Sequence, residues 1–343
     1  MRVLHVTECL AGGVQTALEG YVKATPEIEH FVVANSRRGE NLSTGRVAGC
    51  EACLELPTNH IRAIKYLIAA IRKIQPDVIH AHSSFAGVYS RIVALASKTP
   101  VVYTPHALAY GRPDFPKSRR LVYRALEKIL SKNTKVFAGC SEHESQLLRR
   151  LSANTPVVTI PNALPPDHPS ATLHWKAKTT HVVGMVGRIN DYRDPQRFTE
   201  IAKLVRMQNP NVKFIWIGDG DNQQRAFLQT QGIYVTGWLN SIELQRKITE
   251  LSVLLYTSKW DGFPMVILEA ISSKVPTIVA DIPPLRECPR PARFSTTEEA
   301  AEKVLKELEL NMPLADFWDP LIEAHTFENQ KKALIRTYEI ATS

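Results

Sequence analysis

The sequence predicts an α/β protein with two doubly wound parallel sheets, and three observations support this. Short apolar segments of strand length alternate with segments of helical spacing over almost the whole chain. Several apolar segments end in glycine-containing loops, as expected where strands lead into helices. The alternation stops once, at residues 165–178, which are rich in Pro, Ser, Thr and Lys, and then resumes. A length of 343 residues suits two domains. We therefore predict a domain at 1–164, a linker at 165–178 and a second domain at 179–324.

The first half of the chain predicts one covered parallel sheet. We expect strands at 2–7, 31–34, 77–82, 100–104, 135–139 and 157–160, and helices at 14–23, 61–74, 84–97, 116–132 and 142–151. Residues 37–49 are polar and contain glycine, which predicts a loop.

The second half predicts another such sheet. We expect strands at 181–186, 212–217, 234–236, 251–255 and 276–280, with helices between them, one of them at 266–271, and a last helix at about 327–341. Ligands of such sheets bind beyond the carboxyl ends of the strands, so two facing domains would share one cleft between the Gly12-Gly13 loop and the loop within 256–270.

Residues 256–270, Y-T-S-K-W-D-G-F-P-M-V-I-L-E-A, predict a strand end, a tight loop and the start of a helix. Free backbone N–H groups and the positive end of the helix dipole would meet there, where a phosphate can bind. Asp261 and Glu269 would flank that point. The alternative is an ordinary strand–helix connection with one dipole-compensating acid and one solvated Glu.

Other candidate groups also follow predicted strands. Arg188 and Arg193 lie on one loop and could bind a diphosphate, or they could be surface arginines. His80 and His82 would point to one face of a strand. The sequence around them offers no third ligand, so we expect packed, hydrogen-bonded histidines and no metal site.

The basic excess lies wholly in the first half, where residues 1–162 hold 21 Lys and Arg against 12 Asp and Glu. This asymmetry predicts an acidic partner. The chain has no aromatic-rich basic platform, so we expect no nucleic acid. The basic residues gather before and within the helix predicted at 116–132, and include Arg112, Lys117, Arg119, Arg120 and Arg124. Its apolar residues Val122, Leu126, Ile129 and Leu130 follow helical spacing and are predicted to pack on the sheet. The basic face is then either simply solvated or rests on an anionic membrane surface.

Short segments spread over nearly the whole chain match the motifs of one known family, in that family's order. They are L-A-G-G-V-Q-T-A-L, D-V-I-H-A-H, V-V-Y-T-P-H, I-P-N, V-G-R-I-N-D-Y-R-D-P, I-W-I-G-D-G and D-G-F-P-M-V-I-L-E-A. Through these segments the chain resembles a retaining glycosyltransferase of the GT-B fold, in the large family 4 of sugar transferases. The last segment is similar to the family's E-x7-E signature, with Asp261 in place of the first Glu. Arg193 stands where the family has Lys.

The resemblance implies a role for each matching residue. His106 would contact the transferring sugar, Arg188 and Arg193 the donor diphosphate, and Glu269 the ribose hydroxyls. The remaining donor-binding positions implied are Gly12, Gly13, Gly218, Trp238, Leu239, Gly262, Phe263, Pro264, Met265 and Val266, with Asp261 beside the sugar. The resemblance also implies that the last helix, 325–343, returns to the first domain.

The resemblance implies a metal-independent hexosyltransferase with no cofactor. We expect a nucleoside diphosphate sugar, UDP-linked, as donor and a glycan or polyprenyl-diphosphate-linked glycan of a bacterial surface polysaccharide as acceptor. Five cysteines and the absence of a signal-like start favour a cytoplasmic protein, peripheral at the inner face of the plasma membrane. A GT-B-fold nucleotide-sugar epimerase and a non-catalytic GT-B partner subunit are the alternatives.

Overall fold

The computed structural model describes residues 1–35 and 47–343, so most of the loop predicted at 37–49 lies outside the described residues. The chain forms two compact α/β units. The first comprises Met1–Pro165, Asp261–Met265 and His325–Ser343, and the second comprises Pro166–Trp260 and Val266–Ala324.

The first unit is built on a seven-stranded sheet in the order β3-β2-β1-β4-β5-β6-β7, in which every neighbouring pair is parallel. Its strands are β1 (Arg2–Thr7), β2 (Glu29–Ala34), β3 (Ala52–Glu55), β4 (Val78–His82), β5 (Val101–Thr104), β6 (Val136–Gly139) and β7 (Val157–Thr159). Its helices are α1 (Gly12–Ala24), α2 (His60–Ile74), α3 (Ser84–Ser97), α4 (Lys117–Leu130), α5 (Glu142–Arg149) and α12 (Phe327–Thr342). The strand order reverses between β1 and β4, which is where doubly wound sheets bind ligands.

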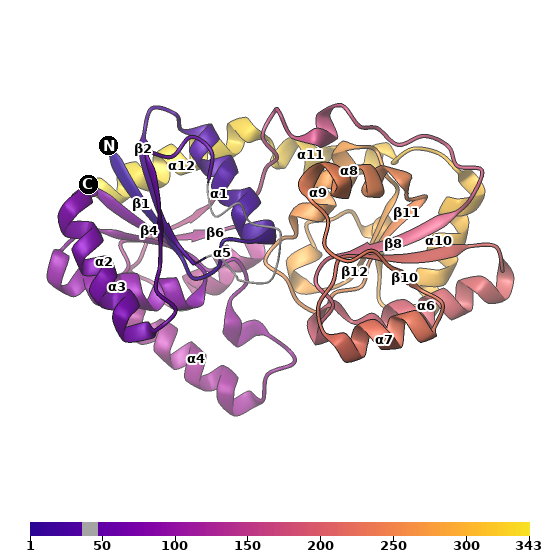
Figure 1. Cartoon of the computed structure of the whole chain (residues 1–343), viewed down its shortest axis with the longest axis horizontal. Coiled ribbons are helices and arrows are strands. Elements are labelled where there is room, and N and C mark those ends of the chain that lie inside the picture. Colours follow the sequence, from indigo (N-terminus) through magenta and orange to yellow (C-terminus); the bar gives the residue numbers. More distant parts are fainter. Residues whose placement is uncertain (36–46) are drawn as a thin grey trace. The chain divides into compact units, whose positions relative to one another are not determined.

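Helices cover both faces of this sheet (Figure 1). One face packs against α1 and α12, through Tyr21, Leu334 and Tyr338. The other packs against α2 and α3, through residues such as Leu67 and Val93. Because both faces are covered, the central strands are mostly apolar, and the histidines among them stand out.

The second unit has a six-stranded parallel sheet in the order β10-β9-β8-β11-β12-β13. Its strands are β8 (Val182–Val186), β9 (Lys213–Ile217), β10 (Tyr234–Val235), β11 (Val253–Tyr256), β12 (Thr277–Ala280) and β13 (Arg293–Phe294). Its helices are α6 (Pro195–Gln208), α7 (Asn222–Thr230), α8 (Ser241–Glu250), α9 (Met265–Ser272), α10 (Thr297–Leu310) and α11 (Asp319–Ala324). Here the order reverses between β8 and β11, so the loops after these two strands leave the sheet at its switch point.

The predicted linker at 165–178 is wrong for most of its length, because Pro166 onward belongs to the second unit. Trp175 explains this: its side chain is buried, and its indole Nε1 donates to the Leu251 carbonyl at 2.9 Å. Its backbone N–H also donates to the Ser273 carbonyl at 2.8 Å. A second correction concerns Asp261–Met265, which belongs to the first unit and not to the predicted second domain.

The packing predicted for α4 is also largely wrong. Of the four predicted contacts, Val122, Ile129 and Leu126 are 65%, 64% and 39% exposed, and only Leu130 is buried. The neighbouring Leu121 is also 65% exposed. The sheet-facing side of α4 carries Glu127 instead. Its carboxylate accepts hydrogen bonds from Arg91 Nη1 at 2.8 Å and from the Tyr103 hydroxyl at 3.0 Å. Burial of this ion pair turns the apolar face of the helix outward.

Candidate active site

The loops at the switch point of the second unit hold Arg188 and Arg193. Arg193 lies on the loop after β8 and donates from Nη1 to the Ser258 hydroxyl, on the loop after β11, at 3.0 Å. The Thr257 hydroxyl in turn donates to the Arg193 carbonyl at 2.9 Å. The guanidinium is therefore held at the point where the two loops leave the sheet, and its charge suits an anionic ligand.

Arg188 belongs to a tightly built turn. Its guanidinium carbon lies 5.5 Å from the centre of the Trp238 ring, within cation–π range. The preceding Gly187 has φ 136°, and its carbonyl accepts a hydrogen bond from Trp216 Nε1 at 2.8 Å. A Cβ on Gly218, which has φ 137°, would lie 2.3 Å from that carbonyl oxygen, so only glycine fits there. The sequence-predicted residues Arg188, Gly218 and Trp238 thus lie on neighbouring loops of one unit. Leu239 and Val266 pack against the apolar cluster of the same unit.

Glu269 is the buried carboxylate of the second unit. It lies on α9 and is 7% exposed, and this burial raises the pKa of its carboxyl to about 7. His168 Nε2 lies 3.9 Å from Oε1 of Glu269. Sequence reasoning missed His168, because it falls in the segment predicted as a linker. A hydrogen-bonding carboxylate kept in an apolar setting can accept two hydroxyl groups or hold a proton.

In the first unit, the Gly12-Gly13 turn follows β1. Gly12 has φ 54° and begins α1, and an added Cβ on Gly13 would lie 3.7 Å from Cγ of Met265. The Gly-Gly turn and the loop at 261–265, predicted to face each other, therefore lie together within this unit. Glu8 joins the adjacent strand ends, since its carboxylate accepts from the Ser83 hydroxyl at 2.7 Å and from the Ala86 N–H at 3.0 Å.

His106 follows β5 in a conformation that non-glycine residues rarely adopt. Its φ is 52° and that of Ala107 is 100°. Buried Glu144 holds this turn by accepting from the Ala107 N–H at 2.7 Å and from the Cys140 N–H at 2.9 Å. Burial also raises the pKa of the Glu144 carboxyl. Backbone strain of this kind gathers at functional sites, and Glu144 was not predicted from the sequence.

The loop at 261–265 is anchored in the first unit by its carbonyl groups. The Ser141 hydroxyl donates to the Gly262 carbonyl at 3.1 Å, and Asn162 Nδ2 donates to the Phe263 carbonyl at 2.7 Å. An added Cβ on Gly262 would lie 2.9 Å from Cys140 Sγ and 3.0 Å from the Ala107 nitrogen. The carboxylate of Asp261 accepts from the Gly262 N–H at 2.8 Å. Pro264 then leads into α9, whose first residue is Met265.

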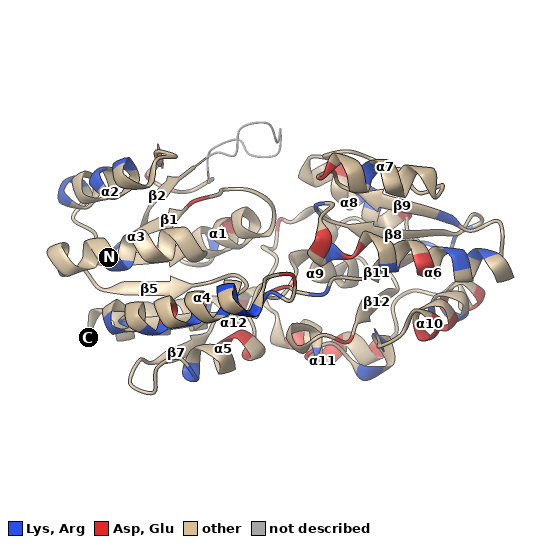
Figure 2. Cartoon of the chain, turned by 90° about the horizontal axis from the view of Figure 1, so that it is seen from below, with Lys and Arg blue, Asp and Glu red and all other residues tan. Residues whose placement is uncertain are grey.

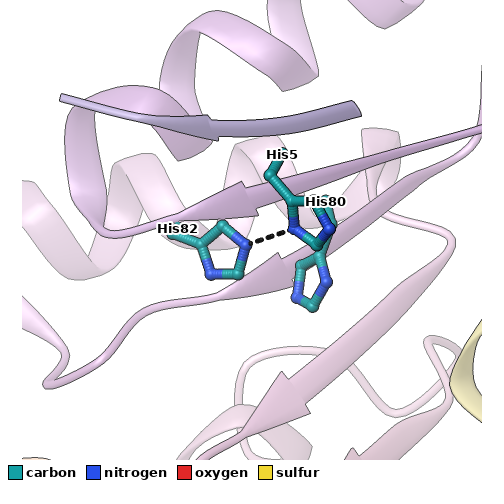
Figure 3. A group of neighbouring side chains, drawn as sticks. All are labelled: His5, His80 and His82. Atoms are coloured by element: carbon teal, nitrogen blue, oxygen red, sulfur yellow. Dashed lines mark hydrogen bonds between the residues drawn. The ribbon is translucent and has the colours of Figure 1, made fainter. Parts of the chain in front are cut away.

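From the sequence we predicted no third potential metal ligand beside His80 and His82, and this prediction is wrong. His5, on the neighbouring strand β1, completes a group whose ligand atoms lie within 4.8 Å of one another (Figure 3). The side-chain nitrogens of all three, however, already have hydrogen-bond partners. The expected packed, hydrogen-bonded histidines are therefore what the structure shows.

Among the described residues, the helices are all too short or too polar to span a bilayer.

Comparison with protein families finds two adjacent matches. Residues 11–168 match "Glycosyltransferase Family 4", and residues 180–308 match "Glycosyl transferases group 1". The chain is 29% identical over 246 residues to an Escherichia coli UDP-Gal:alpha-D-GlcNAc-diphosphoundecaprenol alpha-1,3-galactosyltransferase, a match that covers 65% of this chain and 63% of that protein. It is 24% identical over 358 residues to an uncharacterized protein in the cps region of Klebsiella pneumoniae, covering 98% and 94% of the two chains.

Solved structures agree with the fold. A sucrose-phosphate synthase from Thermosynechococcus elongatus superposes with a TM-score of 0.74 at 14% identity, covering 99% of this chain and 96% of that one. A trehalose-6-phosphate structure from E. coli, bound with UDP-2-fluoro glucose, gives a TM-score of 0.74 at 12% identity and covers 99% of both chains. The chain thus matches a family 4 glycosyltransferase model over most of its first half and a group 1 glycosyltransferase model over most of its second half, and its fold is GT-B.

Proposed function

We propose that this protein is a retaining, metal-independent glycosyltransferase of polysaccharide biosynthesis. It moves a hexose from a UDP-linked sugar to a glycan or a polyprenyl-diphosphate-linked glycan. The observation that carries the proposal is the pair of cations, Arg188 and Arg193, on the loop after β8, with Arg193 held by Ser258. The curated relative named as a UDP-Gal transferase supports the donor class.

In this reaction the bond from the anomeric carbon to the diphosphate oxygen breaks, and a bond to the acceptor oxygen forms. The acceptor proton passes to the departing phosphate oxygen, with attack on the same face as departure. Negative charge grows on the diphosphate, where Arg188 and Arg193 stabilise it. Each such group can contribute about 2–4 kcal/mol to transition-state binding.

Other residues position the donor. Glu269 accepts the ribose hydroxyls, and the loop with Gly218, Trp238 and Leu239 holds the base. His106 and Asp261 contact the transferring sugar. The backbone at Gly12, Gly13 and 262–266 approaches the phosphates of the donor. Asp261 is one methylene shorter than the Glu of the family signature, and its carboxylate also holds the Gly262 N–H.

The acceptor is proposed to be lipid-linked because of α4. Its outward face carries Leu121, Val122, Ala125 and Ile129, all exposed. Basic residues flank this face, and Figure 2 shows Lys and Arg recurring along the helix. These are Arg112, Lys117, Arg119, Arg120, Arg124 and Lys128. An apolar face bordered by cations is the pattern of helices that lie in an anionic membrane interface, where each cation contributes about 1 kcal/mol.

The donor test is release of UDP from a panel of UDP-sugars, measured with and without undecaprenyl-diphosphate-linked GlcNAc. A transferase releases UDP slowly with one donor alone and faster with acceptor, with retained anomeric configuration in the product. An epimerase would interconvert UDP-sugars, and a non-catalytic partner subunit would bind UDP without turnover.

The membrane test is co-sedimentation with vesicles of phosphatidylcholine, with and without phosphatidylglycerol, at low and high salt. Binding should require the anionic lipid and weaken with salt. Changing Leu121 and Ile129 to Ser, or Arg119, Arg120 and Arg124 to Gln, should each release the protein. Changing the exposed residues Met207 and Lys203 of α6 in the same way serves as control. Indifference to anionic vesicles at low salt would contradict a membrane-bound acceptor.

A further inference from the structure

Four histidines of the first unit form a continuous chain of imidazole–imidazole hydrogen bonds. His30 Nδ1 lies 2.9 Å from His5 Nε2, and His5 Nδ1 lies 3.0 Å from His82 Nε2. His82 Nδ1 then lies 3.0 Å from His106 Nε2. Figure 3 shows the His5–His82 step, with His80 beside it but outside the chain. This chain of hydrogen bonds thus leads from His30 on β2 through β1 and β4 to the strained turn after β5.

The far end of this chain has a fixed hydrogen-bond direction. His30 Nε2 lies 3.0 Å from the Thr25 carbonyl oxygen, which can only accept. It also lies 3.0 Å from the Thr25 hydroxyl, whose proton is already donated to the Tyr21 carbonyl at 2.9 Å. Both partners therefore accept, and His30 must carry its proton on Nε2.

A neutral imidazole has one donor nitrogen and one acceptor nitrogen. His5, His30 and His82 are fully buried, and burial lowers the pKa of each ring, as it lowers that of His106 to about 4. All four rings are therefore neutral near pH 7. His30 Nδ1 then accepts from His5 Nε2–H, His5 Nδ1 accepts from His82 Nε2–H, and His82 Nδ1 accepts from His106 Nε2–H.

We propose that this relay locks His106 in the Nε2–H tautomer, so that Nδ1 presents a lone pair to the ligand and accepts a hydrogen bond from a hydroxyl group. His82, His5 and His30 are positioning residues that act through His106. Among the described residues no hydrogen bond reaches His106 Nδ1, and it is not one of the buried atoms that lack a partner. That the hydroxyl belongs to the transferring sugar rests on the proposed function.

The alternative use of these rings is a metal site on His5, His80 and His82. The hydrogen bonds argue against it, because both ring nitrogens of all three histidines are already engaged, so a metal would have to displace at least one hydrogen bond of each ring. The relay keeps every one of these bonds.

The direct test is histidine tautomer assignment by long-range proton–nitrogen NMR on the full-length protein labelled with 15N-histidine, without any donor. His106 is expected to show an unprotonated Nδ1 and a protonated Nε2. His5→Phe, which cuts the relay, should let His106 populate both tautomers. His80→Phe is the matched control, since His80 is as buried and lies beside His82, with ring centres 4.2 Å apart, but is not in the relay.

His82→Asn gives a second variant should His5→Phe not fold. The Asn oxygen replaces Nδ1 as acceptor, so it should keep the His106 tautomer. A protonated Nδ1 in the unaltered protein, or an unchanged tautomer in His5→Phe, would overturn the proposal. Zinc-induced shifts of His5, His80 and His82 together would replace it with a metal site.

Activity gives an independent readout. His5→Phe should lower kcat by about fivefold, the size of one neutral hydrogen bond, with little change in KM for the donor. His82→Asn should recover most of it. If the tautomer is as expected but no UDP-sugar is turned over, the relay stands and the glycosyltransferase proposal fails. If turnover occurs with the opposite tautomer, only the relay fails.

Discussion

Asn162 holds Phe263 in place across 101 residues of sequence: its side-chain N–H donates to the Phe263 carbonyl at 2.7 Å. The backbone carbonyl of Asn162 accepts a hydrogen bond from His325 Nδ1 at 2.7 Å. The His325 ring stacks on the Phe263 ring, with ring centres 4.4 Å apart. These contacts join the segments around Asn162 and His325 to Phe263, and they hold the loop at 261–265 in place within the first unit.

Replacing Asn162 with Ala should loosen that loop. The Phe263 carbonyl would lose its buried donor, at a cost of about 1–3 kcal/mol in the free energy of unfolding. Hydrogen–deuterium exchange should rise in a peptide covering 261–265, and turnover should fall. Exposed Asn211→Ala is the control. Unchanged exchange in the loop would show that Ser141 and the ring stack suffice to hold it.

Removing the guanidinium of Arg188 should lower kcat/KM for the donor by about 10²–10³, because charge on the leaving diphosphate loses its partner. Arg193→Lys keeps a charge but loses the fork that Ser258 orients, so a smaller loss of about tenfold is expected. Steady-state kinetics with the best UDP-sugar measure both. Arg246→Ala, on the exposed face of α8, should behave as the unaltered protein. Equal kinetics in all three variants would refute the assignment of the two cations.

Glu269 should make stability depend on pH. Its folded pKa of about 7 lies above its ordinary value of 4.5, so the folded protein keeps a proton that the unfolded chain loses between these values. The contribution of Glu269 to the free energy of unfolding is therefore fully present below about pH 4.5. It is lost as the pH rises to about 7, which lowers the free energy of unfolding by at most about 3 kcal/mol. Glu269→Gln should remove this slope, as measured by urea unfolding from pH 5 to 8. If the free energy of unfolding still depends on pH in the variant, that dependence comes from other groups, such as His168.

Asp261→Asn should lose transfer while UDP still binds, if the carboxylate contacts the sugar. The Asn oxygen can still accept from the Gly262 N–H, so the loop should keep its conformation. Calorimetric UDP affinity and product formation are measured side by side. Full activity in the Asn variant would reduce Asp261 to an acid that only holds its own loop.

Truncation after Glu323 should unfold the first unit. It removes α12, whose Leu334, Tyr338 and Ala341 lie in the core beside β1, β4 and β5. Leu334→Ala is a milder test, with an expected loss of about 2–5 kcal/mol in denaturant unfolding. A stable, active truncated protein would show that the sheet does not need the helix.

Much of the fold could be predicted because both sheets are covered on two faces, which makes apolar strands alternate with helices. The strand β3 was missed because its four residues include Glu55 and none of them is buried. The error over α4 has one physical cause. Helical spacing identifies an apolar stripe but cannot say which side faces inward, and here the Arg91–Glu127 pair decides it.

The candidate site could be proposed from the sequence where residues follow one another in a motif, as with Arg188 or Glu269. It was not predictable where partners meet across strands. His5, His30 and His82 lie on three strands whose register is set by the sheet, and in the sequence only His5 interrupts an apolar run, whereas His30 precedes one and His82 ends one. The alternation of His80 and His82 places both on one face of a strand, but it does not reveal their partners on other strands or the order of the hydrogen bonds.

The first unit draws on three stretches of chain and the second on two, so the polypeptide passes between them four times. A recombinant chimaera made with a single crossover near residue 165 would therefore give its new first unit another protein's loop at 261–265 and another protein's α12. Asn162 and His80 would then meet foreign partners. Exchange of sugar specificity by domain shuffling, in the laboratory or in the evolution of such genes, therefore requires the three stretches of the first unit to be exchanged as a set.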